Sequence, residues 1–152
     1  MLDHPILAID HGAARIGTAI SDPVGIMAHP LETVPNNENT LERINQIIQE
    51  RQVKSILIGL PLHMNGTEGK ASLKIRNFKN TLKKSLLHAL PIEFIDESLT
   101  TVQAAHKLHE AGRNAKQQKS VIDQAAAVEI LNAYLQSQSN PFGLLENPDE
   151  LL

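Results

Sequence analysis

Residues 7–22 read LAIDHGAARIGTAISD, and the rest of the chain is organised around them. An apolar run at residues 6–9 ends on a carboxylate, Asp10, and a short turn of small residues leads into a second strand-like run at residues 15–21. The turn is brief enough for an antiparallel hairpin. This stretch therefore places an acid where a buried strand ends.

The length and composition favour one compact domain inside the cell. The chain has 152 residues, and it contains no cysteine, which excludes disulfides, a thiolate nucleophile and a cysteine-rich zinc site. No basic leader precedes an apolar run, and no stretch approaches the roughly 18 apolar residues of a membrane helix. We expect residues 1–138 to form the domain, residues 139–152 to be a C-terminal tail, and the protein to be cytoplasmic with no membrane contact.

The charge is unevenly distributed along the chain. The formal net charge is -3, which by itself argues against a nucleic-acid-binding protein, since such proteins tend to be basic. Residues 70–88, however, contain no acid and six basic residues: Lys70, Lys74, Arg76, Lys79, Lys83 and Lys84. A basic helix face is more often solvated surface than binding site, so this segment alone leaves both interpretations open.

Hydrophobic periodicity predicts strands and helices in the order βββαβαβαα. We expect strands at residues 5–10, 15–21, 27–34, 54–59 and 92–95, and helices at residues 41–51, 71–86, 98–111 and 120–136, the last after a polar linker at residues 113–119. Pro30 cannot donate a ladder hydrogen bond, so the third strand belongs at a sheet edge. In the second helix the apolar stripe is Ala71, Ile75, Phe78, Leu82 and Leu86. This order describes one three-layer α/β domain with a mixed sheet.

Three acids are candidates for one functional site. Asp10 and Glu97 end two predicted strands, and ligand crevices in open α/β sheets lie beyond such strand ends. Asp123 opens the last predicted helix, beside alanines that would let the helix approach the sheet. Three carboxylates suit a hard cation, Mg²⁺ or Mn²⁺. Two such ions about 3.5 to 4 Å apart activate a water and stabilise the leaving oxygen in phosphodiester cleavage.

Each acid also has a plainer interpretation. An aspartate at a strand end is often a turn or cap residue, and Asp123 in a first helical turn would interact favourably with the helix dipole. Two histidines, His11 and His63, lie in loops near the expected crevice, where lone histidines are commonly incidental. Spacing alone therefore predicts no more than a metal-dependent enzyme of phosphoryl chemistry.

Three sequence blocks resemble those of the YqgF family, also called the RuvX or pre-16S rRNA nuclease family. The blocks are AIDHGAARIGTAISD at residues 8–22, ILIGLPLHMNGTEGKAS at residues 56–72, and FIDESLTTVQAAHKLHEAG with KQQKSVIDQAAAVEILNAYL within residues 94–135. They span most of the chain in the family's order. This family belongs to the RNase H-like superfamily and is related to Holliday-junction resolvases.

The resemblance implies an RNase H-like three-layer fold, a mixed five-stranded sheet with helices on both faces. It further implies a divalent-metal-dependent endonuclease acting on structured nucleic acid in ribosome biogenesis, with the 5′ end of the 16S rRNA precursor favoured over branched DNA as substrate. The family's acids map onto Asp10, Glu97 and Asp123, which would bind Mg²⁺ or Mn²⁺ and catalyse cleavage. We expect a monomer or a weak homodimer.

The resemblance also implies phosphate contacts outside the acidic site. We expect nucleic-acid contacts from Arg15, Lys70, Lys74, Lys116 and Lys119. The sequence departs from the family at Ala14, where Lys is frequent, and at Ser98, where Arg is common. These departures keep open two alternatives, a Holliday-junction-type DNA resolvase and a non-catalytic nucleic-acid-binding factor. An actin-like ATPase would need two lobes, for which the chain is too short.

Overall fold

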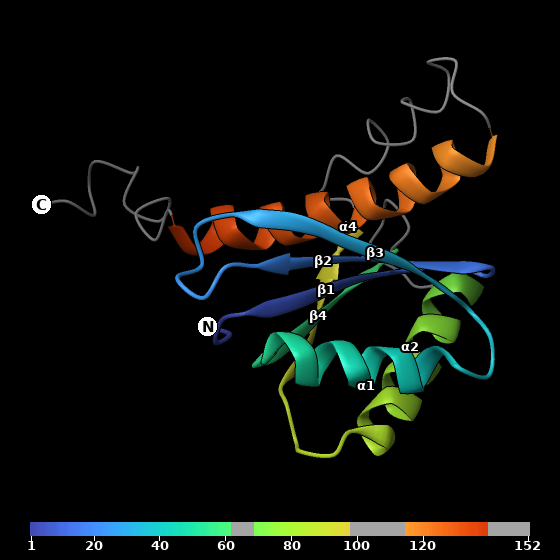
Figure 1. Ribbon diagram of the computed structural model, residues 1–152, viewed down its shortest axis with the longest axis horizontal. Coiled ribbons are helices and arrows are strands. Elements are labelled where there is room, and N and C mark those ends of the chain that lie inside the picture. Colours follow the sequence, from blue (N-terminus) through green and yellow to red (C-terminus); the bar gives the residue numbers. More distant parts are fainter. Residues whose placement is uncertain (62–68, 98–114, 140–152) are drawn as a thin grey trace, which may run out of the picture.

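A computed structural model describes residues 1–61, 69–97 and 115–139 of the chain (Figure 1). Five strands form one sheet in the order β3-β2-β1-β4-β5. The elements are β1 (Ile6–His11), β2 (Arg15–Ser21), β3 (Ala28–Pro35), α1 (Thr40–Arg51), β4 (Ser55–Leu60), α2 (Lys70–Ser85), β5 (Ile92–Asp96) and α4 (Ala115–Ser139). The expected mixed five-stranded sheet is confirmed.

The direction of the strands brings the ends of three of them to one edge. β1, β2 and β3 form an antiparallel meander, whereas β4 runs parallel to β1 and β5 runs parallel to β4. The carboxyl ends of β1, β4 and β5 therefore meet at the same edge of the sheet. We call it the catalytic edge because two of the acids implied by the resemblance, Asp10 and Glu97, lie at the ends of these strands. Asp10 pairs with Gly17 of β2 at this edge, and Leu60 pairs with Asp96 of β5.

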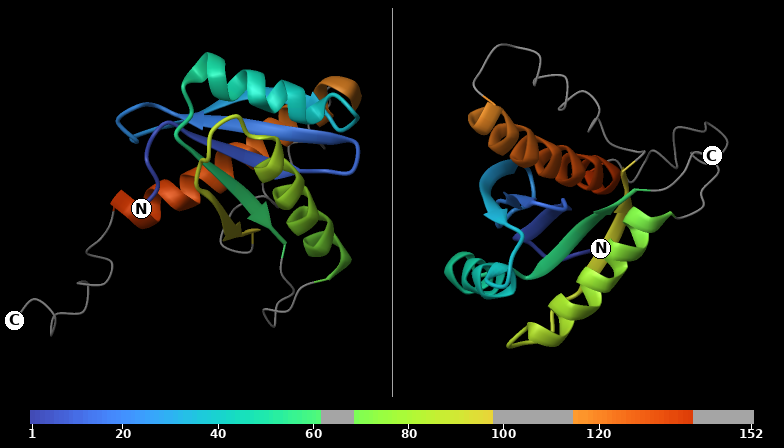
Figure 2. Two further views of the ribbon diagram at one scale, coloured as in Figure 1. Left: turned by 90° about the horizontal axis from the view of Figure 1, so that it is seen from below. Right: turned by 90° about the vertical axis from the view of Figure 1, so that its right-hand side faces the viewer.

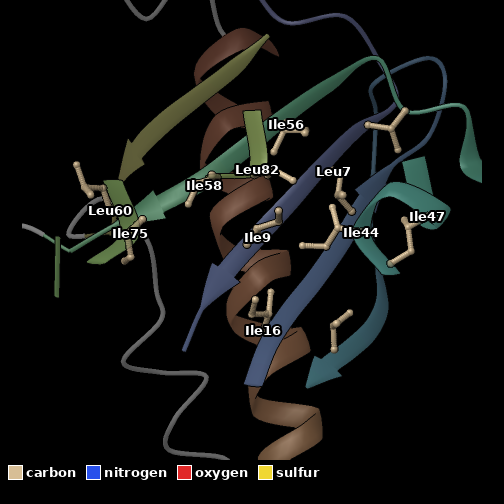
Figure 3. Packing of buried hydrophobic residues seen from close by; sticks show 12 residues of the cluster. Leu7, Ile9, Ile16, Ile44, Ile47, Ile56, Ile58, Leu60, Ile75 and Leu82 are labelled. Atoms are coloured by element: carbon tan, nitrogen blue, oxygen red, sulfur yellow. The ribbon is translucent and has the colours of Figure 1, made fainter. Parts of the chain in front are cut away.

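Helices cover both faces of the sheet, as the resemblance implies (Figure 2). Side chains alternate along β1, so that Leu7 and Ile9 pack with α1 and α2 while Ile6 and Ala8 pack with α4. Figure 3 shows the first of these clusters, in which Ile44 and Ile47 of α1 and Ile75 and Leu82 of α2 pack on the strands. Nearly all residues of β1 and β4 are buried because both faces are covered.

The predicted edge strand is confirmed. β3 lies at one end of the sheet, and its pairing with β2 is irregular between Gly17 and Ala19. Pro30 is exposed there, as expected for a residue that cannot donate a ladder hydrogen bond. Proline at an edge also hinders pairing with a second sheet.

Three details of the predicted helices need correction or fall outside the described residues. α4 starts at Ala115, so the predicted linker is wrong for residues 115–119, where alanine, lysine and glutamine are good helix formers. Ala71 is exposed, and the neighbouring Ser72 is buried instead, with its hydroxyl donating to the Pro61 carbonyl. The predicted helix at residues 98–111 and nearly all of the predicted tail lie outside the described residues. Within the described ranges, no helix has the length and apolarity needed to cross a membrane.

Candidate active site

Two glycines on the strands that flank Asp10 let other elements approach it. Asp10 lies on the α4 side of β1, two residues after Ala8. A Cβ on Gly17 would lie 1.9 Å from the backbone oxygen of Asp123, so α4 packs directly on β2 at that point. A Cβ on Gly59 of β4 would lie 2.7 Å from Oε1 of Glu97. The missing side chains thus bring Asp123 and the Glu97 carboxyl close to the strands on either side of Asp10.

Asp10 and Glu97 are in direct contact at the catalytic edge. Burial raises the pKa of Glu97 to about 7, and the charge of Asp10, a side-chain hydrogen bond with Asp10 and the charge of Asp96 add to the shift. Two carboxylates this close cannot both be ionised at low cost. The pair therefore retains a proton up to about neutral pH.

A pocket of about 270 Å³ opens over this carboxyl pair. It is lined by Asp10, His11, Ala13, Pro61, Ala71, Lys74, Ile75 and Glu97. The pocket therefore combines two acids from the strand ends with one cation from α2. A group carrying both a positive and a negative charge, such as a metal-bound phosphate, matches this lining better than an uncharged ligand does.

Asp123 forms an ion pair with Arg15. Nε of Arg15 donates to Oδ2 of Asp123 at 2.8 Å, and the Asp123 side chain is 17% exposed. Asp123 lies about two turns inside α4, so a helix-dipole role in the first turn does not account for it. Among the described residues, no three histidine or acidic side chains are grouped so that they could hold a metal ion. The assignment of Asp123 as a ligand stays a prediction.

Sequence reasoning missed Asn36, which holds the turn between Asp10 and Arg15. The Asn36 backbone N–H donates to the Ala14 carbonyl at 3.0 Å, and its Nδ2 donates to the Gly12 carbonyl at 2.8 Å. The same Nδ2 lies 3.4 Å from Nε2 of His11. An asparagine after a proline is an ordinary loop signal, so only the fold shows that this one reaches across to the β1–β2 turn.

Replacing Asn36 by Ala is expected to loosen this turn. Two side-chain contacts are lost, and we expect the free energy of unfolding to fall by about 1 to 2 kcal/mol. The nucleic-acid contact that the resemblance implies for Arg15 should weaken several-fold while the folded state persists. Chemical denaturation and binding titrations check both, with Asn80→Ala, an exposed asparagine on α2, as the matched control. Equal behaviour of the two variants would contradict this positioning role.

His11 is an uncharged part of the pocket wall. Its ring centroid lies 4.6 Å from that of Phe78 on α2. Burial lowers the pKa of His11, and the charge of Lys74 lowers it further, against the opposing effect of a backbone hydrogen bond. The imidazole is therefore neutral at neutral pH, and it packs against Phe78 at the side of the pocket. His63 lies outside the described residues.

The Glu97 pKa predicts a pH dependence of stability in the metal-free protein. Folded Glu97 keeps its proton up to about pH 7, whereas the unfolded side chain releases it near 4.5. The folded state then binds more protons between these values, so stability is lost as the pH rises through that window. Urea unfolding in EDTA measures the free energy of unfolding at pH 5 and pH 8. Its decrease from pH 5 to pH 8 should be smaller for Glu97→Gln than for wild type. The comparison with the variant cancels the opposite contribution of His11, and identical pH profiles would refute the prediction.

The four lysines among the predicted basic residues fall into two groups. Lys70 and Lys74 are exposed on the first two turns of α2, next to the pocket. Lys116 and Lys119 lie in the first turns of α4. Ser98 lies outside the described residues.

Comparison with known proteins identifies the family. The family model described as "RuvX: Holliday junction resolvase" matches residues 4–137. The chain belongs to the RuvX family. It is 45% identical over 130 residues to the "Putative pre-16S rRNA nuclease" of Cutibacterium acnes, covering 86% of this chain and 81% of that protein. A RuvX relative of the same name in Lachnospira eligens is 41% identical over 138 residues, covering 88% of this chain and 97% of that protein.

A solved structure shows that this RuvX chain has the fold the resemblance implied. T. thermophilus RuvC, solved in complex with a Holliday junction substrate, superposes with a TM-score of 0.54 and 12% identity, covering 88% of this chain and 95% of that one. At this identity the match concerns the fold alone. The RNase H-like fold and the membership of a nuclease family are confirmed.

Proposed function

We propose that this chain is a divalent-metal-dependent endonuclease that cleaves phosphodiester bonds of structured nucleic acid and processes the 5′ end of the 16S rRNA precursor. The observation that carries the proposal is the contact between Asp10 and Glu97 at the floor of a pocket on the catalytic edge. Relatives that share more than two fifths of the sequence with it are named as pre-16S rRNA nucleases, which favours RNA as the substrate.

The residues present fit Mg²⁺ or Mn²⁺. Asp10 and Glu97 supply hard oxygen donors, and a divalent cation would offset the burial and the charge of Asp10 that raise the pKa of Glu97. Asp123 is the third proposed ligand, from α4. When bound, the divalent ion supplies Lewis-acid activation of the attacking water and of the scissile phosphate.

The remaining residues bind and orient the substrate. Lys74 lines the pocket and is placed to contact a phosphate beside the carboxyl pair. Arg15 pairs with Asp123 in the metal-free protein, and its half-exposed guanidinium can pair with a phosphate as well. Lys70, Lys116 and Lys119 would contact the backbone farther out, which positions the strand without reading its sequence.

A cleavage assay with two substrates tests the proposal. The protein is incubated with a 5′-extended 16S rRNA fragment or with a four-way DNA junction, each with Mg²⁺, Mn²⁺ or EDTA. We expect cleavage of the RNA extension that requires a divalent ion. Cleavage in EDTA, or no cleavage of either substrate with any metal, would refute the proposal.

A DNA resolvase is the second candidate, because the matching family model is described as a Holliday junction resolvase. Both functions use the same carboxyl pair, so the site itself does not separate them. Symmetric cleavage of the DNA junction at a rate exceeding that of the RNA would favour the resolvase.

A further inference from the structure

The side of α2 that faces β5 carries cations that the proposed site does not use. α2 has 16 residues, which gives a length of about 24 Å. Its first turns reach the catalytic edge, where Lys74 lines the pocket. Its later turns lead away from that edge, alongside β5 (Figure 2). No acid occurs between residues 70 and 88, so positive charge continues along the whole helix.

Arg76, Lys79 and Lys83 form a stripe on the β5 side of α2. Their spacing of three and four residues places them on one side of the helix. The guanidinium carbon of Arg76 lies 5.1 Å from the centroid of the Phe94 ring, and Nζ of Lys79 lies 4.9 Å from it. Lys83 is exposed one turn farther along. We call these three residues the β5-side stripe.

The stripe carries more positive charge than is needed to cover the Phe94 ring. Two cations on one aromatic ring gain only about 0.5 to 1 kcal/mol each at an exposed site, and they repel one another. A single aliphatic stem would cover Phe94 equally well. In the part of the chain that the structure describes, no ion pair includes Lys79 or Lys83.

The nearby acids of β5 do not neutralise these two lysines. Glu93 points to the other face of the sheet, because it alternates with Phe94. Asp96 shares the face of Phe94 but ends the strand at the catalytic edge, whereas Lys79 and Lys83 lie on the later turns of α2. Lys79 and Lys83 therefore carry the positive charge of this side of α2 with or without Arg76.

We propose that the β5-side stripe binds the phosphate backbone of a duplex arm that flanks the cleavage point. This inference rests on the proposed nuclease function and adds a requirement on its substrate. From Lys74 to Lys83 the helix rises about 14 Å, a span of about four to five base pairs of a duplex. The site therefore selects nucleic acid in which a duplex of at least about four base pairs continues along α2.

Binding measurements with arms of different length test this inference. Anisotropy titrations in EDTA separate binding from cleavage, and the probes are RNA hairpins whose flanking duplex has 2, 6 or 12 base pairs. The wild-type protein should bind the hairpins with 6 or 12 base pairs about 10-fold more tightly than the hairpin with 2 base pairs. The double variant Lys79→Gln/Lys83→Gln should bind all three alike, with the slope of log K against log salt reduced by about 2.

A charge-matched control removes the same net charge elsewhere. Arg51→Glu changes the net charge by the same two units at an exposed position in the last turn of α1. This control should keep both the dependence on arm length and the salt slope. If the Lys79/Lys83 variant also keeps both, the inference is overturned, and the stripe becomes a candidate surface for an acidic protein.

The two proposals can fail separately. Arm-dependent binding that needs Lys79 and Lys83, in a protein that cleaves nothing with any metal, would support the stripe and refute the nuclease function. Metal-dependent cleavage with binding that ignores arm length would support the nuclease function and refute the stripe.

Discussion

Replacing Asp10 by Asn is expected to reduce metal-dependent cleavage by about 100-fold or more, the effect of removing one electrostatic stabiliser of a transition state. Asn keeps the shape of the side chain but loses the charge that faces Glu97. The pKa of Glu97 should therefore fall toward its ordinary value, because the charge of Asp10 and the hydrogen bond to it both raise that pKa. Single-turnover cleavage and carboxyl NMR measure the two effects.

The matched control for this variant is Asp3→Asn, which removes an exposed carboxylate away from the pocket. It should leave both the cleavage rate and the Glu97 pKa unchanged. Glu97→Gln should match Asp10→Asn in lost cleavage, since both would lose a metal ligand. An Asp10→Asn protein that cleaves at the wild-type rate would exclude Asp10 from catalysis, whatever its effect on Glu97.

The pairing of Asp10 with Glu97 could be predicted because it depends on strand direction alone. Each acid follows a short apolar run, and parallel strands place such ends at one edge. The sheet order follows from similarly local signals, such as the brief turn after Asp10 and the proline in β3. Patterns of this kind need no knowledge of side-chain contacts.

The contacts across the fold could not be predicted, because they join residues far apart in the sequence. The Arg15–Asp123 ion pair spans 108 positions, and the hydrogen bond from Asn36 to Gly12 spans 24. The start of α4 was also missed, since polar residues at 115–119 carry no apolar period even though each favours a helix.

Gly17→Ala and Gly59→Ala are expected to damage the site in different ways. At Gly17 the new methyl would meet the backbone oxygen and carbon of Asp123 at 1.9 and 2.4 Å, so α4 itself must move. We expect a loss of about 2 to 3 kcal/mol in the free energy of unfolding, in the range of overpacked cores. At Gly59 the new methyl would meet the ends of two side chains, Ile130 Cδ1 at 2.6 Å and Glu97 Oε1 at 2.7 Å, which can rotate away.

Gly59→Ala should therefore cost less stability than Gly17→Ala but still lower cleavage by about 10-fold or more, because a small misplacement of a catalytic group is expensive. Its signature is a Glu97 carboxyl displaced from Asp10, which lowers the Glu97 pKa while the thermal midpoint stays close to that of wild type. Each variant controls for the other in urea unfolding and in cleavage assays. If the two variants lost equal stability, a contact with a helix backbone would cost no more than a contact with two side-chain ends. The close approach of α4 at Gly17 would then not be what fixes the position of Asp123.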